Sequence, residues 1–148
     1  MGSQLSFRPI ADKSLQKQPS SVKFIEDLYL LVLESFMNNL EKPHLSVVVP
    51  VFNEEGSLRP LHEEIVAALG GFMYEIIYVD DGSTDKSFSI LTDICEKTSH
   101  VSIIRLRRNF GQTAALSAGF KYARGAIIVP LDADGQNDPA DIPQLVQK

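Results

Sequence analysis

The stretch LSVVVPVFNEEGSL, residues 45–58, decides the fold of this chain. Its first seven residues are mostly apolar and β-branched, which is typical of a strand buried on both faces of a sheet. A polar loop follows, and Ser57 is placed to cap a helix whose apolar face runs from Leu58 to Leu69. The stretch therefore predicts a buried strand that leads through a polar loop into an amphipathic helix.

The same alternation continues toward the carboxyl end of the chain. We expect further strands over Tyr74–Asp80, Val101–Leu106 and Ala126–Leu131, and helices over about 84–98 and 112–123. Asp138 is the predicted N-cap of a last helix that begins at Pro139. Strands that alternate with helices of this length predict right-handed βαβ units and a parallel sheet with helices on both faces, so the fold class is α/β.

Composition and charge narrow the possible functions. The 148 residues are 44% hydrophobic and 22% charged, which is typical of a globular chain of about one domain. Residues 45–148 carry the whole net charge of −5, and this acidic balance disfavours a nucleic-acid binder. No apolar run approaches the roughly 18 residues that a membrane-spanning helix needs. The single Cys95 cannot form an internal disulfide, and we expect a chain of the reducing cytoplasm.

Residues 1–44 differ in character from the rest. Up to about Ser20 they are polar without periodicity, which predicts a flexible arm. A helix is expected over about 22–40, where apolar residues recur at helical spacing: Ile25, Leu28, Val32, Phe36 and Leu40. Because its middle is apolar nearly all round, we expect this helix to pack on the domain or to mediate self-association with a second copy. A helix that lies on a membrane surface is the alternative, although few Lys or Arg residues support it.

Polar side chains follow every predicted strand. Because the carboxyl ends of parallel strands meet at one edge of the sheet, these side chains should lie close together. Carboxylates predominate among them, and gathering carboxylates is costly unless a cation or a hydrogen-bonding ligand joins them. The residues concerned are Asn53, Glu54 and Glu55; Asp80, Asp81 and Ser83; Arg107, Arg108 and Asn109; and Asp132, Asp134, Gln136 and Asn137.

The tripeptide Asp132-Ala133-Asp134 is the candidate metal site. Residues two apart in an extended chain point the same way, so both carboxylates can approach one hard cation. Mg²⁺ and Mn²⁺ prefer such oxygen ligands and are completed by water and substrate phosphates. Gln136 can offer a carbonyl oxygen to the same ion. The alternative is that the two aspartates only stabilise a turn.

The pair Asp80-Asp81 and the arginines after the third strand are candidates for nucleotide binding. A carboxylate here can accept a hydrogen bond from an imide-type N–H, which uracil and guanine carry and adenine lacks, so UDP or GDP is favoured over ADP. Of Arg105, Arg107 and Arg108, one or two are expected to hold phosphate oxygens, and we assign Arg108 to the nucleotide.

Four segments, VVPVFNEEGSL, IIYVDDGSTD, RNFGQTAALSAG and VPLDADGQNDP, resemble in their order and spacing a family 2 glycosyltransferase. The resemblance is strongest to the branch that transfers a sugar to a polyprenyl or dolichyl phosphate. It covers Leu45 to Lys148 and leaves out residues 1–44. It implies the GT-A fold, of which residues 45–148 would be the half that binds the nucleotide-sugar, truncated after the metal motif.

The resemblance also implies roles for particular residues. Pro50, Phe52 and Glu54 would line the nucleoside pocket, and Asp81 would meet the base. Asp132 and Asp134 would be the catalytic metal motif, with Gln136 as a third ligand. Two departures from the branch are Phe52, which stands where tyrosine is frequent, and Gly135, which replaces an apolar residue.

The activity that the resemblance implies is a metal-dependent, inverting transfer from a UDP- or GDP-sugar to a polyprenyl phosphate. A phosphate acceptor, with its second pKa near 6, is ionised at neutral pH and needs no general base. The full-length protein would then work at the cytoplasmic membrane face. Because the family fold continues beyond residue 148, we expect this chain alone to be an inactive fragment.

Three other functions are open to the sequence. A non-catalytic module that binds a nucleotide or a partner is the main alternative. A chain that serves chiefly for dimerisation through residues 22–40 is another. A receiver-like signalling domain is disfavoured. It would have an acidic pair after the first strand and a lone Asp after the third, whereas here the third strand ends in Arg107-Arg108-Asn109.

Overall fold

A computed structural model describes residues 20–40 and 42–146 of the chain. The chain divides into two units, Met1–Glu41 and Lys42–Lys148. The predicted flexible arm lies outside the described residues, except for Ser20 at its end.

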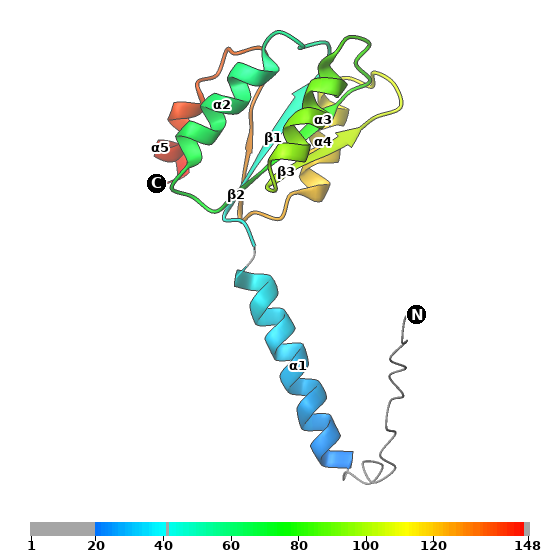
Figure 1. The fold of residues 1–148 in the computed structure, drawn as a ribbon, viewed down its shortest axis with the longest axis vertical. Coiled ribbons are helices and arrows are strands. Elements are labelled where there is room, and N and C mark those ends of the chain that lie inside the picture. Colours follow the sequence, from blue (N-terminus) through cyan, green and yellow to red (C-terminus); the bar gives the residue numbers. More distant parts are fainter. Residues whose placement is uncertain (1–19, 41, 147–148) are drawn as a thin grey trace, which may run out of the picture. The chain divides into compact units, whose positions relative to one another are not determined.

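The second unit is built on a four-stranded parallel sheet (Figure 1). Its strands are β1 (Leu45–Val51), β2 (Tyr74–Asp80), β3 (Val101–Arg105) and β4 (Ile127–Pro130). They lie in the order β3-β2-β1-β4, so Leu45 pairs with Tyr74 on one side and with Ile127 on the other. The predicted strands and the α/β class are confirmed. The order in which strands are added to the sheet reverses between β1 and β4, and ligands of α/β sheets bind at such a point.

Helices cover both faces of this sheet. On one face, α2 (Leu58–Leu69), α3 (Ser87–Lys97) and α5 (Ile142–Val146) pack on alternate strand residues such as Val47 and Val49. A short 3₁₀ turn, η2 (Pro139–Asp141), leads into α5, and Asp138 caps it by accepting from the Ala140 N–H at 2.9 Å. On the other face, α4 (Gln112–Tyr122) packs on Val48, Ile77 and Val79.

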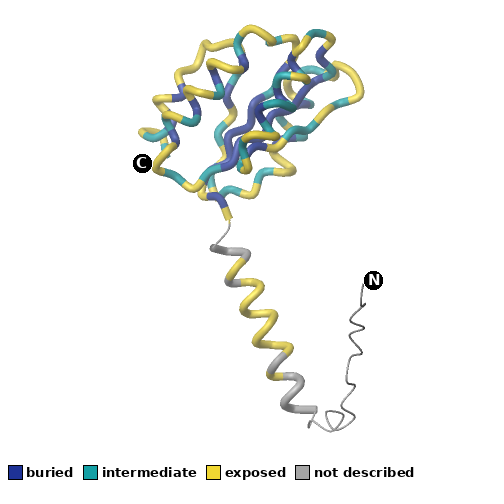
Figure 2. Tube along the Cα trace, viewed as in Figure 1, coloured by how far each residue is buried: buried dark blue, intermediate teal, exposed yellow. Residues whose placement is uncertain are grey.

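The central strand β1 forms the middle of the core, shown dark blue in Figure 2. Val47, Val48 and Val49 are fully buried, and each contributes roughly 1.5–3 kcal/mol by its removal from water. The α4 helix approaches β1 closely, because a β-carbon at Gly119 would overlap the Val48 side chain. Ala115, nearer the amino end of α4, belongs to the same buried cluster as Val48, so the helix packs on β1 along its length.

Helix α3 begins at Ser87, three residues later than the pattern predicts. The intervening residues form a turn whose backbone is bonded elsewhere: the N–H groups of Thr84 and Asp85 donate to the Asn53 side chain. The sequence pattern cannot reveal this acceptor, because it lies some 30 residues away in the loop after β1.

The first unit contains helix α1 (Ser20–Leu40), which begins two residues before the predicted start. Its described apolar side chains are 38–64% exposed within this unit and comprise Ile25, Leu28, Tyr29, Leu30, Leu31, Val32, Leu33 and Met37. Among the described residues, no helix is long and apolar enough to cross a membrane.

Candidate functional site

A pocket of about 310 Å³ lies at the carboxyl edge of the sheet, beside the point where the strand order reverses. Segments after all four strands contribute to it, as expected for this architecture. The lining residues are Pro50, Val51, Phe52, Glu54, Asp81, Asn109, Gly111, Gln112, Ala115, Asp132, Ala133 and Asp134. Six predicted site residues, from the first, second and fourth strand ends, thus come together in one pocket.

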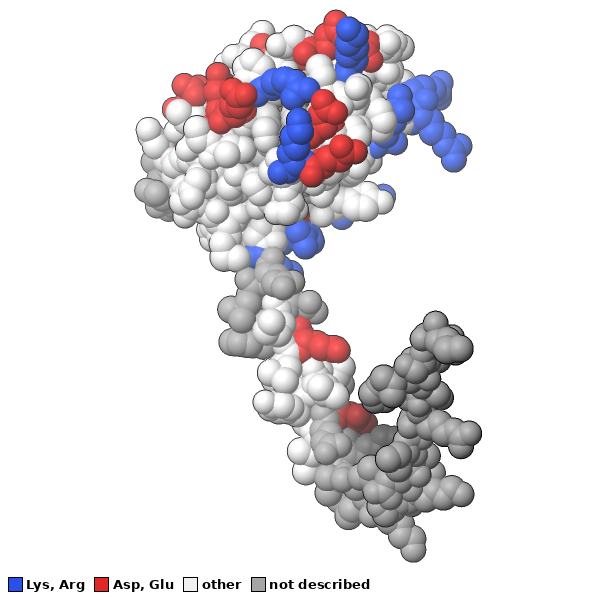
Figure 3. Space-filling model, viewed as in Figure 1, with Lys and Arg blue, Asp and Glu red and all other residues white. Residues whose placement is uncertain are grey.

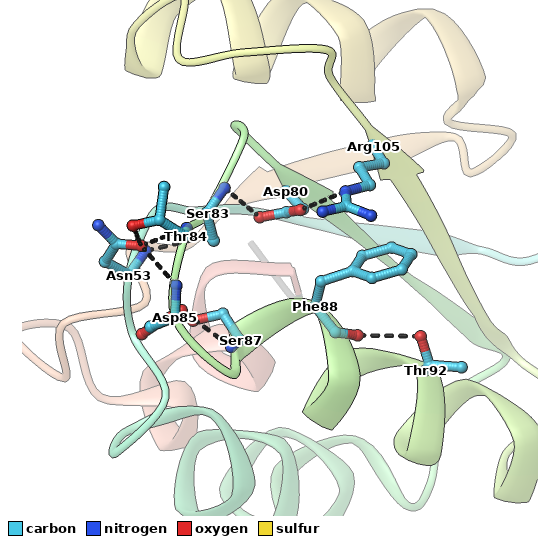
Figure 4. A network of polar contacts seen from close by, with 9 residues as sticks. All are labelled: Asn53, Asp80, Ser83, Thr84, Asp85, Ser87, Phe88, Thr92 and Arg105. Carbon is cyan, nitrogen blue, oxygen red and sulfur yellow. Dashed lines mark hydrogen bonds and ion pairs between the residues drawn. The ribbon is translucent and has the colours of Figure 1, made fainter.

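The loop after β1 is anchored to the turn after β2 through Asn53 (Figure 4). Asn53 has a left-handed backbone with φ of 56°, which asparagine tolerates better than most residues. Its Oδ1 accepts from the Thr84 N–H at 2.8 Å, and its own N–H donates to Ser83 Oγ at 3.0 Å. These contacts fix the loop on which Phe52 and Glu54 reach the pocket.

Two further bonds complete this anchor. The Glu54 N–H donates to Ser87 Oγ at 2.8 Å, and the Ser57 hydroxyl donates to the Glu54 carboxylate at 2.9 Å. Ser57 stands at the predicted N-cap position of α2 but makes no side-chain cap bond there.

Burial opposes ionisation of Asp85, but hydrogen bonds from Ser87 hold the pKa of the Asp85 carboxyl below its usual value.

Asp80 is fully buried and is not among the residues that line the pocket. Its Oδ1 accepts from the Ser83 N–H at 3.0 Å, and its Oδ2 lies 3.3 Å from Arg105 Nε (Figure 4). The Arg105 guanidinium stacks over the Phe88 ring at 3.9 Å from its centroid. Asp80 and Arg105 therefore join β2, β3 and α3, and neither lines the pocket.

Asp81 lines the pocket and also holds the loop between β3 and α4. It is 3% exposed, and its two oxygens accept from the N–H groups of Phe110 and Gly111, each at 2.8 Å. The next residue, Gly82, has φ of 72°, and a β-carbon there would lie 2.5 Å from the Arg108 carbonyl carbon. Each oxygen of an ionised Asp81 keeps one further lone pair for a ligand.

Asp132 lies two residues after the end of β4, and Ala133 and Asp134 form a turn after it. Both aspartates line the pocket. Asp132 Oδ1 accepts from Gln112 Nε2 at 2.6 Å, and its Oδ2 has a longer contact of 3.4 Å with Asn137 Nδ2. Asp134 Oδ1 accepts from the Gln136 N–H at 3.0 Å, which stabilises the turn.

The oxygen ligands in this pocket suit a cation whose remaining coordination positions are filled by a bound ligand. Among the residues the structure describes, no group of three or more His, Cys, Asp or Glu side chains is placed to hold a metal. Asp132 and Asp134 supply two carboxylates, and Mg²⁺ is commonly held by one or two carboxylates together with water and substrate phosphates. The residues therefore fit a divalent ion bound jointly with a phosphate-bearing ligand.

Two predicted site residues do not line the pocket. The Arg108 guanidinium stacks over the Phe110 ring, 4.7 Å from its centroid, and the Gln136 side chain is exposed. Basic side chains gather at the edge that carries the loop after β3 (Figure 3).

Sequence reasoning missed Gln112 as a site residue. The available signal was a polar residue directly after the helix-opening Gly111.

Comparisons with known proteins agree on one family. The model of Glycosyl transferase family 2 matches residues 46–148. An undecaprenyl-phosphate 4-deoxy-4-formamido-L-arabinose transferase of Enterobacter sp. (strain 638) is 49% identical over 116 residues, covering 76% of this chain and 36% of that protein. A dodecaprenyl-phosphate galacturonate synthase of Rhizobium johnstonii is 47% identical over 107 residues, covering 70% and 32%. The chain thus spans about a third of the length of these relatives.

Solved structures show the same fold. Staphylococcus aureus TarS 1-349 superimposes with a TM-score of 0.56 at 23% identity, over 70% of this chain and 31% of that chain. The mannosyltransferase PcManGT of Pyrobaculum calidifontis, solved with GDP-Man and Mn²⁺, gives 0.54 at 24% identity, over 71% and 31%. Glucosyl-3-phosphoglycerate synthase of Mycobacterium tuberculosis, solved with Mn²⁺, UDP and phosphoglyceric acid, gives 0.55 at 27% identity, over 71% and 38%.

Proposed function

This chain belongs to glycosyltransferase family 2 and has the family's GT-A fold, and on that premise we propose that residues 45–148 bind the nucleotide-sugar donor of an inverting glycosyltransferase. The observation that carries the proposal is the single pocket at the strand-order reversal. It gathers Glu54 and Asp81 with both aspartates of the Asp132-Ala133-Asp134 motif. No other arrangement on the described residues combines carboxylates from three strand ends in this way.

The nucleoside occupies the end of the pocket formed after β1 and β2. Phe52, 42% exposed, offers a flat apolar surface on which a base can stack, and Pro50 and Glu54 complete that wall. The free lone pairs of Asp81 accept the imide N–H of uracil or guanine. The donor is accordingly a UDP- or GDP-sugar, and two of the solved relatives were crystallised with UDP and with GDP-Man.

The diphosphate occupies the end of the pocket at Asp132 and Asp134. These two residues would hold Mg²⁺ or Mn²⁺. For Gln136 to be a third ligand and for Arg108 to reach the phosphates, both side chains would have to turn into the pocket, whose lining they do not join in this structure. When bound, the ion neutralises charge on the leaving diphosphate as a Lewis acid. The carboxylates of Asp132 and Asp134 keep that ion at the wall of the pocket, where the sugar–phosphate bond is to break.

The acceptor in the whole protein is a polyprenyl phosphate. The named relatives use undecaprenyl phosphate or dodecaprenyl phosphate. A phosphate monoester is largely ionised at neutral pH and attacks without a general base. Such an acceptor places the full-length protein at the cytoplasmic membrane face. The present chain, whose match spans about a third of the length of these relatives, would bind the donor without transferring the sugar.

Calorimetry with nucleotides tests this function. UDP, GDP and ADP are titrated into the 148-residue chain with Mn²⁺ or with a chelator. We expect UDP or GDP to bind at least tenfold more tightly than ADP, and only with Mn²⁺. Equal affinity for the three nucleotides, unaffected by the chelator, would contradict the proposal. Clear sugar transfer to undecaprenyl phosphate by this chain would contradict its description as the donor-binding portion only.

Self-association through α1 is proposed as a second property of the chain. Asp27 and Glu34 lie seven residues apart and share one side of the helix, which leaves a wide apolar arc opposite them. A second copy can cover that arc, whereas these acidic residues disfavour an anionic membrane surface. Analytical ultracentrifugation should show a dimer that becomes a monomer with Leu28→Asp and Val32→Asp, while the control Glu34→Ala stays dimeric. A monomeric wild type that floats with phosphatidylcholine vesicles would instead favour the membrane interpretation.

A further inference from the structure

We propose that Gln112 is a positioning residue that holds the Asp132 carboxylate ready for a divalent cation, an inference that rests on the proposed function of this pocket. Gln112 is the first residue of α4, and its Nε2 lies 2.6 Å from Asp132 Oδ1. The two residues are 20 positions apart in the sequence and come from different elements. Their hydrogen bond therefore ties the amino end of α4 to the turn after β4.

The backbone of Gln112 is itself held in place. The preceding residue, Gly111, has φ of 97°, a conformation that glycine adopts with little strain. The N–H groups of Phe110 and Gly111 both donate to Asp81, which is buried. The backbone of Gln112 thus starts one residue away from a fixed anchor, so only its side-chain rotamers have to be ordered when the amide reaches Asp132.

The contacts of Asp132 are unequal. Oδ1 has the short bond to Gln112, whereas Oδ2 has only the 3.4 Å contact with Asn137. Gln112 therefore fixes the carboxylate while one oxygen stays free to exchange a weak partner for a cation. Partners that orient a metal-binding carboxylate typically change metal affinity by about 10–100-fold when they are removed.

A manganese titration followed by electron paramagnetic resonance tests this role, with UDP present and the 148-residue chain intact. We expect Gln112→Ala to weaken Mn²⁺ binding about tenfold. Gln112→Glu, which keeps the side-chain size but replaces the donating N–H₂ by an acceptor, should weaken it as well. Thr113→Ala, at the neighbouring exposed position of α4, is the matched control and should bind as the wild type does. Thermal unfolding of each variant identifies any loss caused by misfolding.

The outcomes distinguish a failure of this inference from a failure of the proposed function on which it rests. Wild-type Mn²⁺ affinity in a correctly folded Gln112→Ala variant would overturn the positioning role and leave the donor site standing. Tighter binding by Gln112→Glu would overturn it too, because it would make position 112 a direct ligand of the cation. A wild-type chain that binds no Mn²⁺ with either UDP or GDP would overturn the proposed function itself.

Discussion

Two pairs of aspartates end strands at the same edge of the sheet, and their surroundings differ. Asp80 and Asp81, after β2, are buried, and backbone N–H groups donate to three of their four oxygens. Asp132 and Asp134, after β4, are partly or fully exposed. Their partners are the side-chain amides of Gln112 and Asn137 and one N–H of their own turn.

The difference separates carboxylates that backbone N–H groups hold in place from carboxylates whose partners are mostly side-chain amides. A backbone N–H cannot leave without moving its loop, and an unpaired buried donor costs about 1–3 kcal/mol. A side-chain amide can turn to water at little cost. We therefore expect substitutions of the aspartates at the end of β2 to affect mainly the free energy of unfolding. Substitutions of the aspartates after β4 should affect mainly ligand binding.

The largest expected effect is at β4. The double variant Asp132→Asn, Asp134→Asn removes both anions, and we expect Mn²⁺-dependent nucleotide affinity to fall at least 100-fold, or about 2.7 kcal/mol. The free energy of unfolding should change by less than about 0.5 kcal/mol, as is usual for exposed positions. Calorimetry and urea denaturation measure the two quantities. Unchanged nucleotide affinity in the folded variant would remove the distinction between the pairs.

Asp81→Asn should have the next largest effect, and on stability. The new N–H₂ group faces a backbone N–H that the carboxylate satisfied, so one of the donors from Phe110 and Gly111 is left unpaired. We expect a loss of about 2 kcal/mol in the free energy of unfolding by urea denaturation. Asp134→Asn is the matched control, with little loss. An Asp81→Asn chain as stable as the wild type would show that the buried pair is not structural.

Asp80→Asn sharpens the comparison within the buried pair. The amide keeps an oxygen for the Ser83 N–H but loses the charge that faces Arg105, whose side chain is 52% exposed and therefore screened by solvent. We expect a loss of about 1 kcal/mol, smaller than that of Asp81→Asn. In 1 M NaCl the difference from the wild type should shrink, because salt screens the ion pair. A loss that salt leaves unchanged would mean that the hydrogen bond, not the charge, dominates.

The sequence predicts the elements better than it predicts the contacts between them. Strand ends follow from runs of apolar residues, so the site could be assigned to one sheet edge and its carboxylates named. The sequence shows two adjacent aspartates after β2 but not that backbone groups of a later loop occupy Asp81. The bond from Gln112 to Asp132 depends on how closely α4 packs on β1, which only the three-dimensional fold defines.

Arg108 and helix α1 also show that the sequence predicts an element without predicting the partners of its side chains. The sequence places Arg108 near the phosphates by its position after β3, yet its guanidinium stacks on Phe110 outside the pocket lining. The apolar pattern of residues 22–40 correctly predicts a helix but not what covers it. Periodicity reports the local backbone, whereas the partner of a side chain depends on elements that the pattern does not connect.

The smallest effect concerns Glu75, a third buried carboxylate, at the opposite end of β2. Burial raises its pKa, but hydrogen bonds from Ser46 and Arg124, together with the Arg124 charge, outweigh this and hold the pKa below the usual 4.5. Because the folded state binds its proton less readily than the unfolded state, the ionised group stabilises the fold above the unfolded pKa. That contribution is lost as pH falls through the folded pKa. Glu75→Gln should therefore be less stable than the wild type at pH 7, with the gap narrowing below about pH 4.5. Urea denaturation across pH 3–7 measures this difference in the free energy of unfolding. A difference that is constant over this range would show that ionisation of Glu75 does not stabilise the fold.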